Sequence, residues 1–167
     1  RQDDTSYTYQ EVFARVQGIM PFVQDCPEDI IGIIAEDCIE TYASILAVLL
    51  SGKTYVILHP NYPDSRNRTI VESTGMKRVL YGHASGTQQG LSNEIKCIST
   101  LELRDENIDH LTGEQTQDTN KNAYIIFTSG STGVPKGVPI SRKNLNAFYA
   151  AYHQLGWPVS YTHLRAH

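Results

Sequence analysis

Residues 123–137 read AYIIFTSGSTGVPKG, and this stretch is the most informative part of the chain. Its apolar and aromatic start is typical of a buried strand, and it stops abruptly at a loop of hydroxyls and glycines that closes on a lysine. Glycines let backbone N–H groups converge on one point, hydroxyls add donors, and the lysine adds a positive charge on a flexible stem. The combination predicts a loop that binds an anion, and it suits a polyphosphate.

Two other interpretations of the loop are a flexible linker and the phosphate-binding loop of a nucleotide hydrolase. Stretches rich in glycine, serine and threonine are usually flexible linkers or turns, but this one lies between the apolar run 123–127 and a second apolar segment, Val138-Pro139-Ile140. The Walker pattern of P-loop nucleotide hydrolases is absent, because no Gly-Lys-Ser/Thr follows a glycine at the required spacing. A hydrolase that uses this loop is therefore disfavoured.

The ten residues from Thr128 to Gly137 match, without departure, the pattern Thr-Ser-Gly-Ser-Thr-Gly-x-Pro-Lys-Gly. They resemble the phosphate-binding signature of the AMP-forming adenylating enzymes. That superfamily includes acyl- and aryl-CoA synthetases, luciferases and the adenylation domains of nonribosomal peptide synthetases. A glycine-rich motif carries a general risk of false matches, but a complete match over this length favours the family strongly.

Two upstream segments add to the resemblance, and all three occur in the family's order. Residues 7–12, YTYQEV, resemble the opening core motif, and residues 50–63, LSGKTYVILHPNYP, resemble the second core motif with departures at Leu50, Ile57 and His59. The Tyr-Val and Pro-x-Tyr-Pro elements are similar to amino-acid-activating members. Residues 140–148 also resemble D-alanine–carrier protein ligases.

The resemblance implies that the loop binds the phosphates of ATP and that Thr128 contacts Mg²⁺. The residues implied to hold the nucleotide are Thr128, Ser129, Gly130, Ser131, Thr132, Gly133, Lys136 and Gly137. Lys136 would neutralise phosphate charge or hold the loop in place, and Gly137 would permit a close backbone approach. No catalytic residue is expected in this chain, because the family's adenine- and ribose-binding motifs, substrate pocket and lid with the catalytic lysine lie further downstream.

The implied reaction is ATP-dependent adenylation of a carboxylate, most simply an amino acid. It would give an acyl-AMP and pyrophosphate before transfer to the phosphopantetheine thiol of a carrier protein. The chain is expected to be an incomplete fragment, with residues 1–160 forming a partial amino-terminal AMP-binding domain and residues 161–167 forming a non-native tail or a divergent loop. The alternatives are an acyl- or aryl-CoA synthetase and, from another class, a non-catalytic ATP-binding or interaction fragment.

Composition limits the remaining function classes. With 167 residues, 40% of them hydrophobic and 19% charged, the chain is expected to form one globular domain. A net charge of −4 gives no basic field for nucleic acid, and no apolar run approaches the roughly 18 residues of a membrane span. Cys26, Cys38 and Cys97 show no pairing pattern, which fits a reducing compartment and predicts a cytoplasmic protein. Neither the cysteines nor the six histidines have metal-ligand spacing, so the sequence predicts no zinc site.

Hydrophobic periodicity predicts alternating helices and strands. A capping box of Thr8 and Glu11 begins the first helix, and a second helix has a predicted buried face of Ile39, Tyr42, Ile45, Leu46 and Leu49, with Gly52 at its end. Strands are predicted at 30–35, 54–58, 78–81, 95–98 and 123–127, and further helices at 65–73 and after Ser141, the last ending before Gly156. A polar surface connection is predicted at 104–122. The order predicts an α/β fold, a largely parallel sheet with helices on both faces, which by resemblance is the amino-terminal part of the large domain of the adenylate-forming enzymes.

Overall fold

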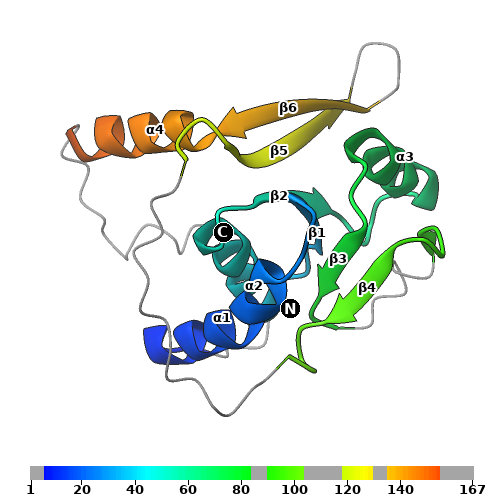
Figure 1. The fold of residues 1–167 in the computed structure, drawn as a ribbon, viewed down its shortest axis with the longest axis horizontal. Coiled ribbons are helices and arrows are strands. Elements are labelled where there is room, and N and C mark those ends of the chain that lie inside the picture. Colours follow the sequence, from blue (N-terminus) through cyan, green and yellow to red (C-terminus); the bar gives the residue numbers. More distant parts are fainter. Residues whose placement is uncertain (1–5, 84–89, 104–117, 130–134, 155–167) are drawn as a thin grey trace.

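The computed structural model describes residues 6–83, 90–103, 118–129 and 135–154. Within these residues, six strands form one sheet in the order β4-β3-β1-β2-β5-β6, and four helices accompany it (Figure 1). The strands are β1 (Ile30–Ile34), β2 (Thr54–Leu58), β3 (Arg78–Tyr81), β4 (Lys96–Ser99), β5 (Asn122–Ser129) and β6 (Pro135–Ser141). The helices are α1 (Tyr9–Gln24), α2 (Ile39–Leu50), α3 (Asp64–Thr74) and α4 (Arg142–Gln154).

The sheet is parallel except at one edge. β1 pairs with β2 and β3, β2 pairs with β5, and β3 pairs with β4, all in parallel, whereas β6 runs antiparallel to β5. The chain reaches β2 from β1 through α2 and then returns past β1 to β3 through α3. Right-handed crossovers in opposite directions place these two helices on opposite faces, as Figure 1 shows. The predicted α/β fold with helices on both faces is confirmed.

The first face of the sheet is covered by α1 and α2, which pack on each other. α1 begins at the predicted capping box: the Glu11 N–H donates to the Thr8 hydroxyl at 3.2 Å, and the Thr8 N–H donates to the Glu11 carboxylate at 2.7 Å. The core on this face consists of the side chains of Val16, Ile19, Met20, Val23, Cys26, Ile31, Ile33, Ala43, Ala47, Val48 and Leu80.

The predicted buried face of α2 is wrong for its largest side chains. Tyr42 is 58% exposed and Leu46 is 41% exposed, whereas Ala43 and Ala47 are fully buried. The small alanine side chains let α2 lie close to α1 and the sheet, so the helix turns its bulky residues outward. The spacing of large hydrophobic residues alone could not reveal this orientation, because alanine counts weakly in such a pattern. The helix does end as predicted, with Gly52 at a positive φ of 73°.

The second face of the sheet is covered by α3. The core here consists of the side chains of Ile34, Val56, Leu58, Ile70, Val71, Met76, Val79 and Leu91. Gly32 faces this core, and a Cβ added to it would lie 2.6 Å from the Met76 sulfur and 2.8 Å from Val79 Cγ2. The absence of a side chain at Gly32 therefore lets Met76, which follows α3, and Val79 of β3 approach β1 closely.

The edge formed by β5 and β6 differs from the sequence expectation. The segment around Val138 to Ile140 is a strand that returns antiparallel to β5, not merely an apolar bracket of a loop. Pro139 disfavours a strand interior, but an edge strand needs only one side for hydrogen bonds and tolerates proline. The Thr54 hydroxyl donates to the Asn122 carbonyl at 2.9 Å, and the Arg142 guanidinium donates to the Lys53 carbonyl at 2.8 Å, so two side-chain contacts tie this edge to the start of β2.

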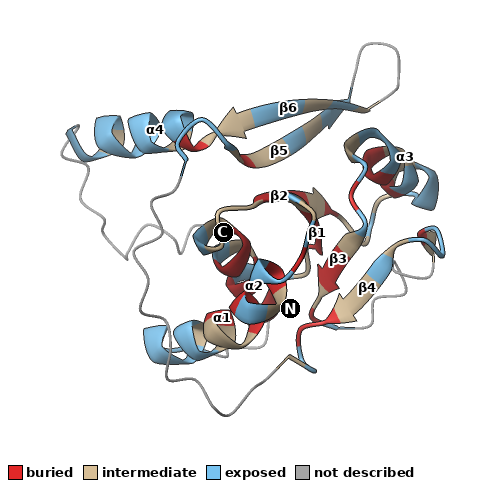
Figure 2. Cartoon of the chain, viewed as in Figure 1, coloured by how far each residue is buried: buried red, intermediate tan, exposed pale blue. Residues whose placement is uncertain are grey.

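The other predicted elements lie where the sequence placed them, within one residue at their ends, except that β5 continues two residues past its predicted end at Phe127 and includes Thr128 and Ser129. α4 begins after Ser141, whose hydroxyl accepts from the Asn144 N–H at 3.1 Å. Most of the polar connection 104–122 and the proposed tail 161–167 lie outside the described residues, as do Gly156 and Pro158. Figure 2 shows that buried residues concentrate around β1, β2, β3, α1 and α2, while β5 and β6 are mostly half-buried or exposed and α4 is mostly exposed.

Candidate functional site

The candidate phosphate loop joins β5 to β6. Thr128 and Ser129 are the last two residues of β5, and Lys136 and Gly137 are the second and third residues of β6. The predicted residues Gly130, Ser131, Thr132 and Gly133 lie outside the described part of the chain. β5 runs parallel to β2, so the loop leaves the sheet at the edge where all the parallel strands end. Open α/β sheets bind ligands at this edge.

The register of the hairpin decides which predicted site residues face each other. Thr128 pairs with Lys136, and Ser129 pairs with Pro135. Directly opposed residues of an antiparallel pair project to the same face, and neighbours along a strand project to opposite faces. Thr128 and Lys136 therefore share one face, and both are exposed. Ser129 projects to the other face. The sequence predicted both hydroxyl residues in the loop, but the structure places them in β5, where they point to opposite faces of the strand.

Gly137 allows a close approach, as predicted, but the group it approaches lies within the hairpin. A Cβ added to Gly137 would lie 3.0 Å from Phe127 Cζ and 3.1 Å from Ile125 Cγ2. Phe127 is the register partner of Gly137, so the aromatic ring crosses to the opposite strand over the space that a side chain would fill. Gly137 thus leaves space for the Phe127 ring, which packs across the hairpin on the face opposite to Thr128 and Lys136.

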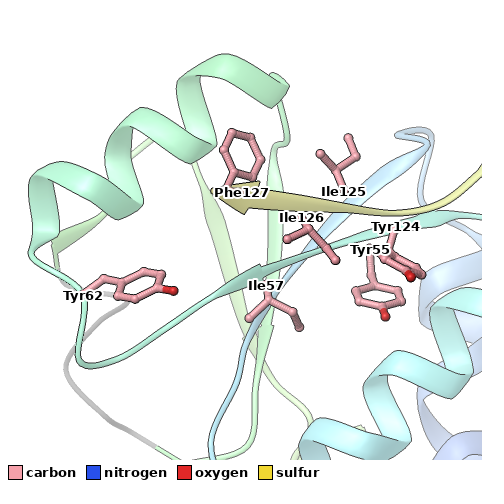
Figure 3. A pocket seen from close by; sticks show the side chains of 7 residues that line it. All are labelled: Tyr55, Ile57, Tyr62, Tyr124, Ile125, Ile126 and Phe127. Atoms are coloured by element: carbon pink, nitrogen blue, oxygen red, sulfur yellow. The ribbon is translucent and has the colours of Figure 1, made fainter. Parts of the chain in front are cut away.

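A pocket of about 390 Å³ lies along β2 and β5, whose pairing covers two residues of each strand. Figure 3 shows aromatic and branched side chains from β2, β5 and the turn before α3 around it. The lining residues are Tyr55, Ile57, Tyr62, Tyr124, Ile125, Ile126 and Phe127. Ile126 is 50% exposed, so the wall of the pocket presents apolar surface to the outside.

The tyrosines give this apolar pocket its polar groups. The rings of Tyr55 and Tyr124 stack with their centroids 5.3 Å apart, and burial, with a smaller contribution from Tyr124, raises the pKa of Tyr55 above its usual value. The guanidinium of Arg66 lies over the Tyr62 ring at 4.3 Å from its centroid, which is a cation–π contact. This pocket was not predicted from the sequence. The feature that could have indicated it is the set of tyrosines in residues 50–63 and just before the loop, because these tyrosines line the pocket.

The arrangement can hold an anion beside the adjoining ends of β5 and β6. On one face, Lys136 supplies an ammonium group and Thr128 a hydroxyl, and the exposed strand end leaves room for a ligand outside the sheet. The Thr128 hydroxyl oxygen is also the group on this face that can contact a magnesium ion, because Mg²⁺ prefers oxygen ligands and retains several waters.

Among the residues the structure describes, no helix is both long and apolar enough to cross a membrane.

The family model described as AMP-binding enzyme matches residues 1–164. The chain is 32% identical over 150 residues to surfactin synthase subunit 1 of Bacillus subtilis, a match that covers 84% of this chain and 4% of the relative. It is also 32% identical over 153 residues to N-(5-amino-5-carboxypentanoyl)-L-cysteinyl-D-valine synthase of Amycolatopsis lactamdurans, covering 88% of this chain and 4% of that protein. The chain thus spans a small part of the length of these relatives.

Solved structures share the fold. O-succinylbenzoate coenzyme A synthetase from Bacillus subtilis, in complex with AMP, superposes with a TM-score of 0.75 at 22% identity, over 95% of this chain and 42% of that one. The nonribosomal peptide synthetase FmoA3, in its form bound to α-methyl-L-serine-AMP, superposes with a TM-score of 0.73 at 21% identity, over 88% of this chain and 16% of that one. These likenesses show that the sheet and its helices have the arrangement found in adenylate-forming enzymes.

Proposed function

The chain belongs to the AMP-binding enzyme family, and from that premise we propose that it forms part of a ligase that uses ATP to adenylate a carboxylate. The observation that carries the proposal is the position of the ten-residue signature. Its described residues lie at the end of β5 and the start of β6, at the carboxyl edge of the sheet, with Thr128 and Lys136 opposed on one exposed face. This is the edge where α/β folds bind nucleotides.

In the proposed reaction, a carboxylate oxygen forms a bond to the α-phosphorus of ATP while the bond from that phosphorus to the pyrophosphate oxygen breaks. The products are an acyl-AMP and pyrophosphate. Two anions must approach each other, and charge accumulates around the α-phosphate, so positioning and electrostatic stabilisation are the main contributions a protein can make. A hairpin that fixes the triphosphate at one place would supply the positioning, and a positive charge beside the triphosphate would supply the electrostatic stabilisation.

The residues present fit a triphosphate group. Lys136 can neutralise phosphate charge and Thr128 can donate a hydrogen bond from the same face, since both are exposed at the end of their strands. Ser129, on the opposite face, is assigned a contact through its backbone N–H or hydroxyl as the chain enters the loop. We assign the backbone amides and hydroxyls of residues 130–133 to the β- and γ-phosphates, because glycine-rich loops form such anion nests. Mg²⁺, when bound, neutralises phosphate charge, and Thr128 is the residue assigned to contact it.

An amino acid is the carboxylate we propose. Two of the relatives at about 30% identity support it: the Amycolatopsis synthase is named for a peptide product, and a match of 31% identity over 156 residues in Aspergillus flavus is named a nonribosomal peptide synthetase. The second half-reaction would then transfer the acyl group to the phosphopantetheine thiol of a carrier protein, with the sulfur attacking the acyl carbon and AMP leaving.

The reaction consumes ATP, and Cys26, Cys38 and Cys97 are free thiols, so we place it in the reducing cytoplasm.

A coenzyme A thiol is the competing acceptor, because the O-succinylbenzoate coenzyme A synthetase shares the fold over almost the whole chain. At 22% identity that likeness concerns the fold alone, so the carrier thiol is preferred. The test is exchange of labelled pyrophosphate into ATP by the full-length protein, with panels of amino acids and of fatty and aryl acids. Exchange with an amino acid and product formation without coenzyme A are expected. Exchange with fatty or aryl acids only, or an absolute need for coenzyme A, would overturn the amino-acid assignment.

The chain of residues 1–167 by itself is expected to bind ATP weakly and to form no adenylate. The signature residues sit on a hairpin that is largely exposed, and the residues that would hold adenine and the carboxylate are assigned to other parts of the protein. Substantial pyrophosphate exchange by this polypeptide alone would contradict that division of roles.

A further inference from the structure

We propose that Cys38, Glu40 and His83 form a site for a divalent transition metal of the zinc class. Each residue offers one ligand atom, and these atoms all lie within 4.8 Å of one another. Cys38 is the N-cap of α2, Glu40 is the second residue of that helix, and His83 follows β3. The site is separate from the β5–β6 hairpin and does not depend on the function proposed above.

The topology of the sheet brings these three residues together although His83 is far from the others in sequence. The chain leaves β1 toward β2 on one side and later enters β3 on the other side, so β1 and β3 flank the point where the strand order reverses. Loops from the carboxyl ends of two such strands diverge and leave a crevice between them, which is where α/β sheets bind ligands. Cys38 and Glu40 come from the loop and helix after β1, and His83 comes from the loop after β3.

The geometry of Glu40 suits a metal ligand that is held by its surroundings. Its side chain is 8% exposed, and the Arg15 Nε donates to its Oε1 at 3.2 Å. The other carboxylate oxygen, Oε2, lies 4.0 Å from His83 Nε2. A charged hydrogen bond on one oxygen orients the carboxylate, and such outer partners are the usual means by which proteins fix a metal ligand.

Two backbone features hold the histidine segment beside this pair. The His83 N–H donates to Glu36 Oε2 at 2.9 Å, which ties the end of β3 to the end of β1. A Cβ added to Gly82 would lie 2.8 Å from Glu40 Cβ and 3.1 Å from Cys38 Sγ, so the chain passes the two residues at a distance that only glycine allows. The next residue, His83, is thereby held beside Cys38 and Glu40, and its side chain is 62% exposed.

The donor set identifies the class of metal. A thiolate, an imidazole and a carboxylate are the ligands that zinc and its neighbours accept, whereas magnesium and calcium take oxygen ligands only. Tetrahedral bonds of about 2.0 to 2.3 Å put ligand atoms roughly 3.3 to 3.8 Å apart, so the present separations close by small side-chain rotations. Among the described residues around the site, Glu36, Asp37 and Glu40 are acidic and Arg15 on α1 is basic, so negative charge predominates there and favours a divalent cation. Three protein ligands leave a fourth position for water.

A purely structural explanation exists for the same residues. Arg15, Glu40 and a protonated His83 can form an ion-pair network, and Cys38 Sγ lies 3.5 Å from the Thr41 hydroxyl, a weak hydrogen bond at the start of α2. That explanation gives the Cys38 sulfur no role that a serine oxygen could not fill, since serine is a preferred N-cap residue. A metal site requires the thiolate. Substitution of Cys38 by serine therefore separates the two explanations without threatening the fold.

The experiment is a titration of the metal-free protein with Co²⁺ under reducing conditions, followed by displacement with Zn²⁺. We expect thiolate-to-cobalt charge-transfer absorption that saturates at one equivalent and disappears as Zn²⁺ is added. Cys38→Ser should abolish this absorption, and His83→Gln should weaken Zn²⁺ binding by about tenfold or more. The controls are Cys97→Ser, where burial raises the pKa of the thiol, and His153→Gln on α4. Both should stay within about twofold of the parent affinity.

A second readout guards against a variant that is merely misfolded. The far-ultraviolet circular dichroism of each metal-free variant should match the parent, and Zn²⁺ should raise the thermal midpoint of the parent and of Cys97→Ser but not of Cys38→Ser. Three results would overturn the proposal: no thiolate–cobalt absorption in the parent, absorption that persists in Cys38→Ser, or absorption lost in Cys97→Ser.

Discussion

Lys136 lies directly opposite Thr128 across the β5–β6 hairpin, so an ammonium group and a hydroxyl project from one face at the carboxyl edge of the sheet. The main-chain register of the hairpin fixes this relationship. On the other face, the packing of the Phe127 ring against Gly137 stabilises the same register. The position of the two groups is thus set by strands and not by the loop between them.

Lys136→Ala should weaken ATP binding by the full-length protein by roughly 10- to 100-fold, since a charge-assisted contact to a phosphate contributes roughly 1.5 to 3 kcal/mol. Lys143→Ala on the exposed side of α4 is the matched control for loss of one positive charge and should change the affinity less than about twofold. Isothermal titration with ATP measures both. Equal losses in the two variants would mean that Lys136 acts only through overall charge.

Thr54→Val should lower the free energy of unfolding by about 1 to 2 kcal/mol. The Thr54 hydroxyl is buried and donates to the Asn122 carbonyl, 68 residues away, so its loss leaves that carbonyl without this partner inside the protein. Thr69→Val on α3 removes a hydroxyl that donates to a carbonyl in the same helix near solvent, and it should cost less than about 0.5 kcal/mol. Urea unfolding of both variants makes the comparison, and similar losses would contradict a special role for Thr54.

The capping box predicts a pH-dependent term in stability. The backbone N–H of Thr8, and then its hydroxyl, hold the pKa of Glu11 below its usual value. A carboxyl whose pKa is lower in the folded state stabilises the protein above its unfolded pKa and loses that contribution as the pH falls through the folded pKa. Glu11→Gln should therefore lower the urea midpoint near pH ~7 and approach the parent near pH ~3. A difference between the two proteins that stays constant over this range would refute the linkage.

Gly32→Ala should destabilise the fold by about 1 to 3 kcal/mol, because the new methyl group would overlap Val79 Cγ2 and the Met76 sulfur in a fully packed core. The Met76 side chain can move through several torsions, whereas Val79 Cγ2 moves only if the side chain changes its χ1 rotamer or the strand shifts. Combining Gly32→Ala with Val79→Ala should cost less than the sum of the two single losses, since the second change makes room for the first. Thermal unfolding of the three variants tests this, and strict additivity would rule out the proposed overlap.

The sequence predicted the parts of this fold in which local signals and packing agree. The Thr8–Glu11 box, the strand at 54–58 and the end of α2 before Gly52 all lie where their residues indicated. The outward turn of Tyr42 and Leu46 was not predictable in this way. It depends on how closely two alanines let α2 approach its neighbours, and that is a property of the assembled core.

The site was predicted less completely than the fold. The signature predicted where a loop would lie, but β6 was missed because Pro135, Gly137 and Pro139 are poor strand residues whose cost disappears at a sheet edge. The opposite faces of Thr128 and Ser129 follow only once that strand is known. The proximity of Cys38 to His83 had no local signal at all, because it arises from the reversal of strand order around β1.

Exchange of labelled pyrophosphate into ATP by the full-length protein tests the central claim most directly, measured with an amino-acid panel for the parent and for Lys136→Ala. We expect exchange that depends on at least one amino acid and falls by about tenfold or more in the variant. The central claim would be contradicted by steady release of phosphate from ATP without any carboxylate, or by amino-acid-dependent exchange that Lys136→Ala leaves unchanged.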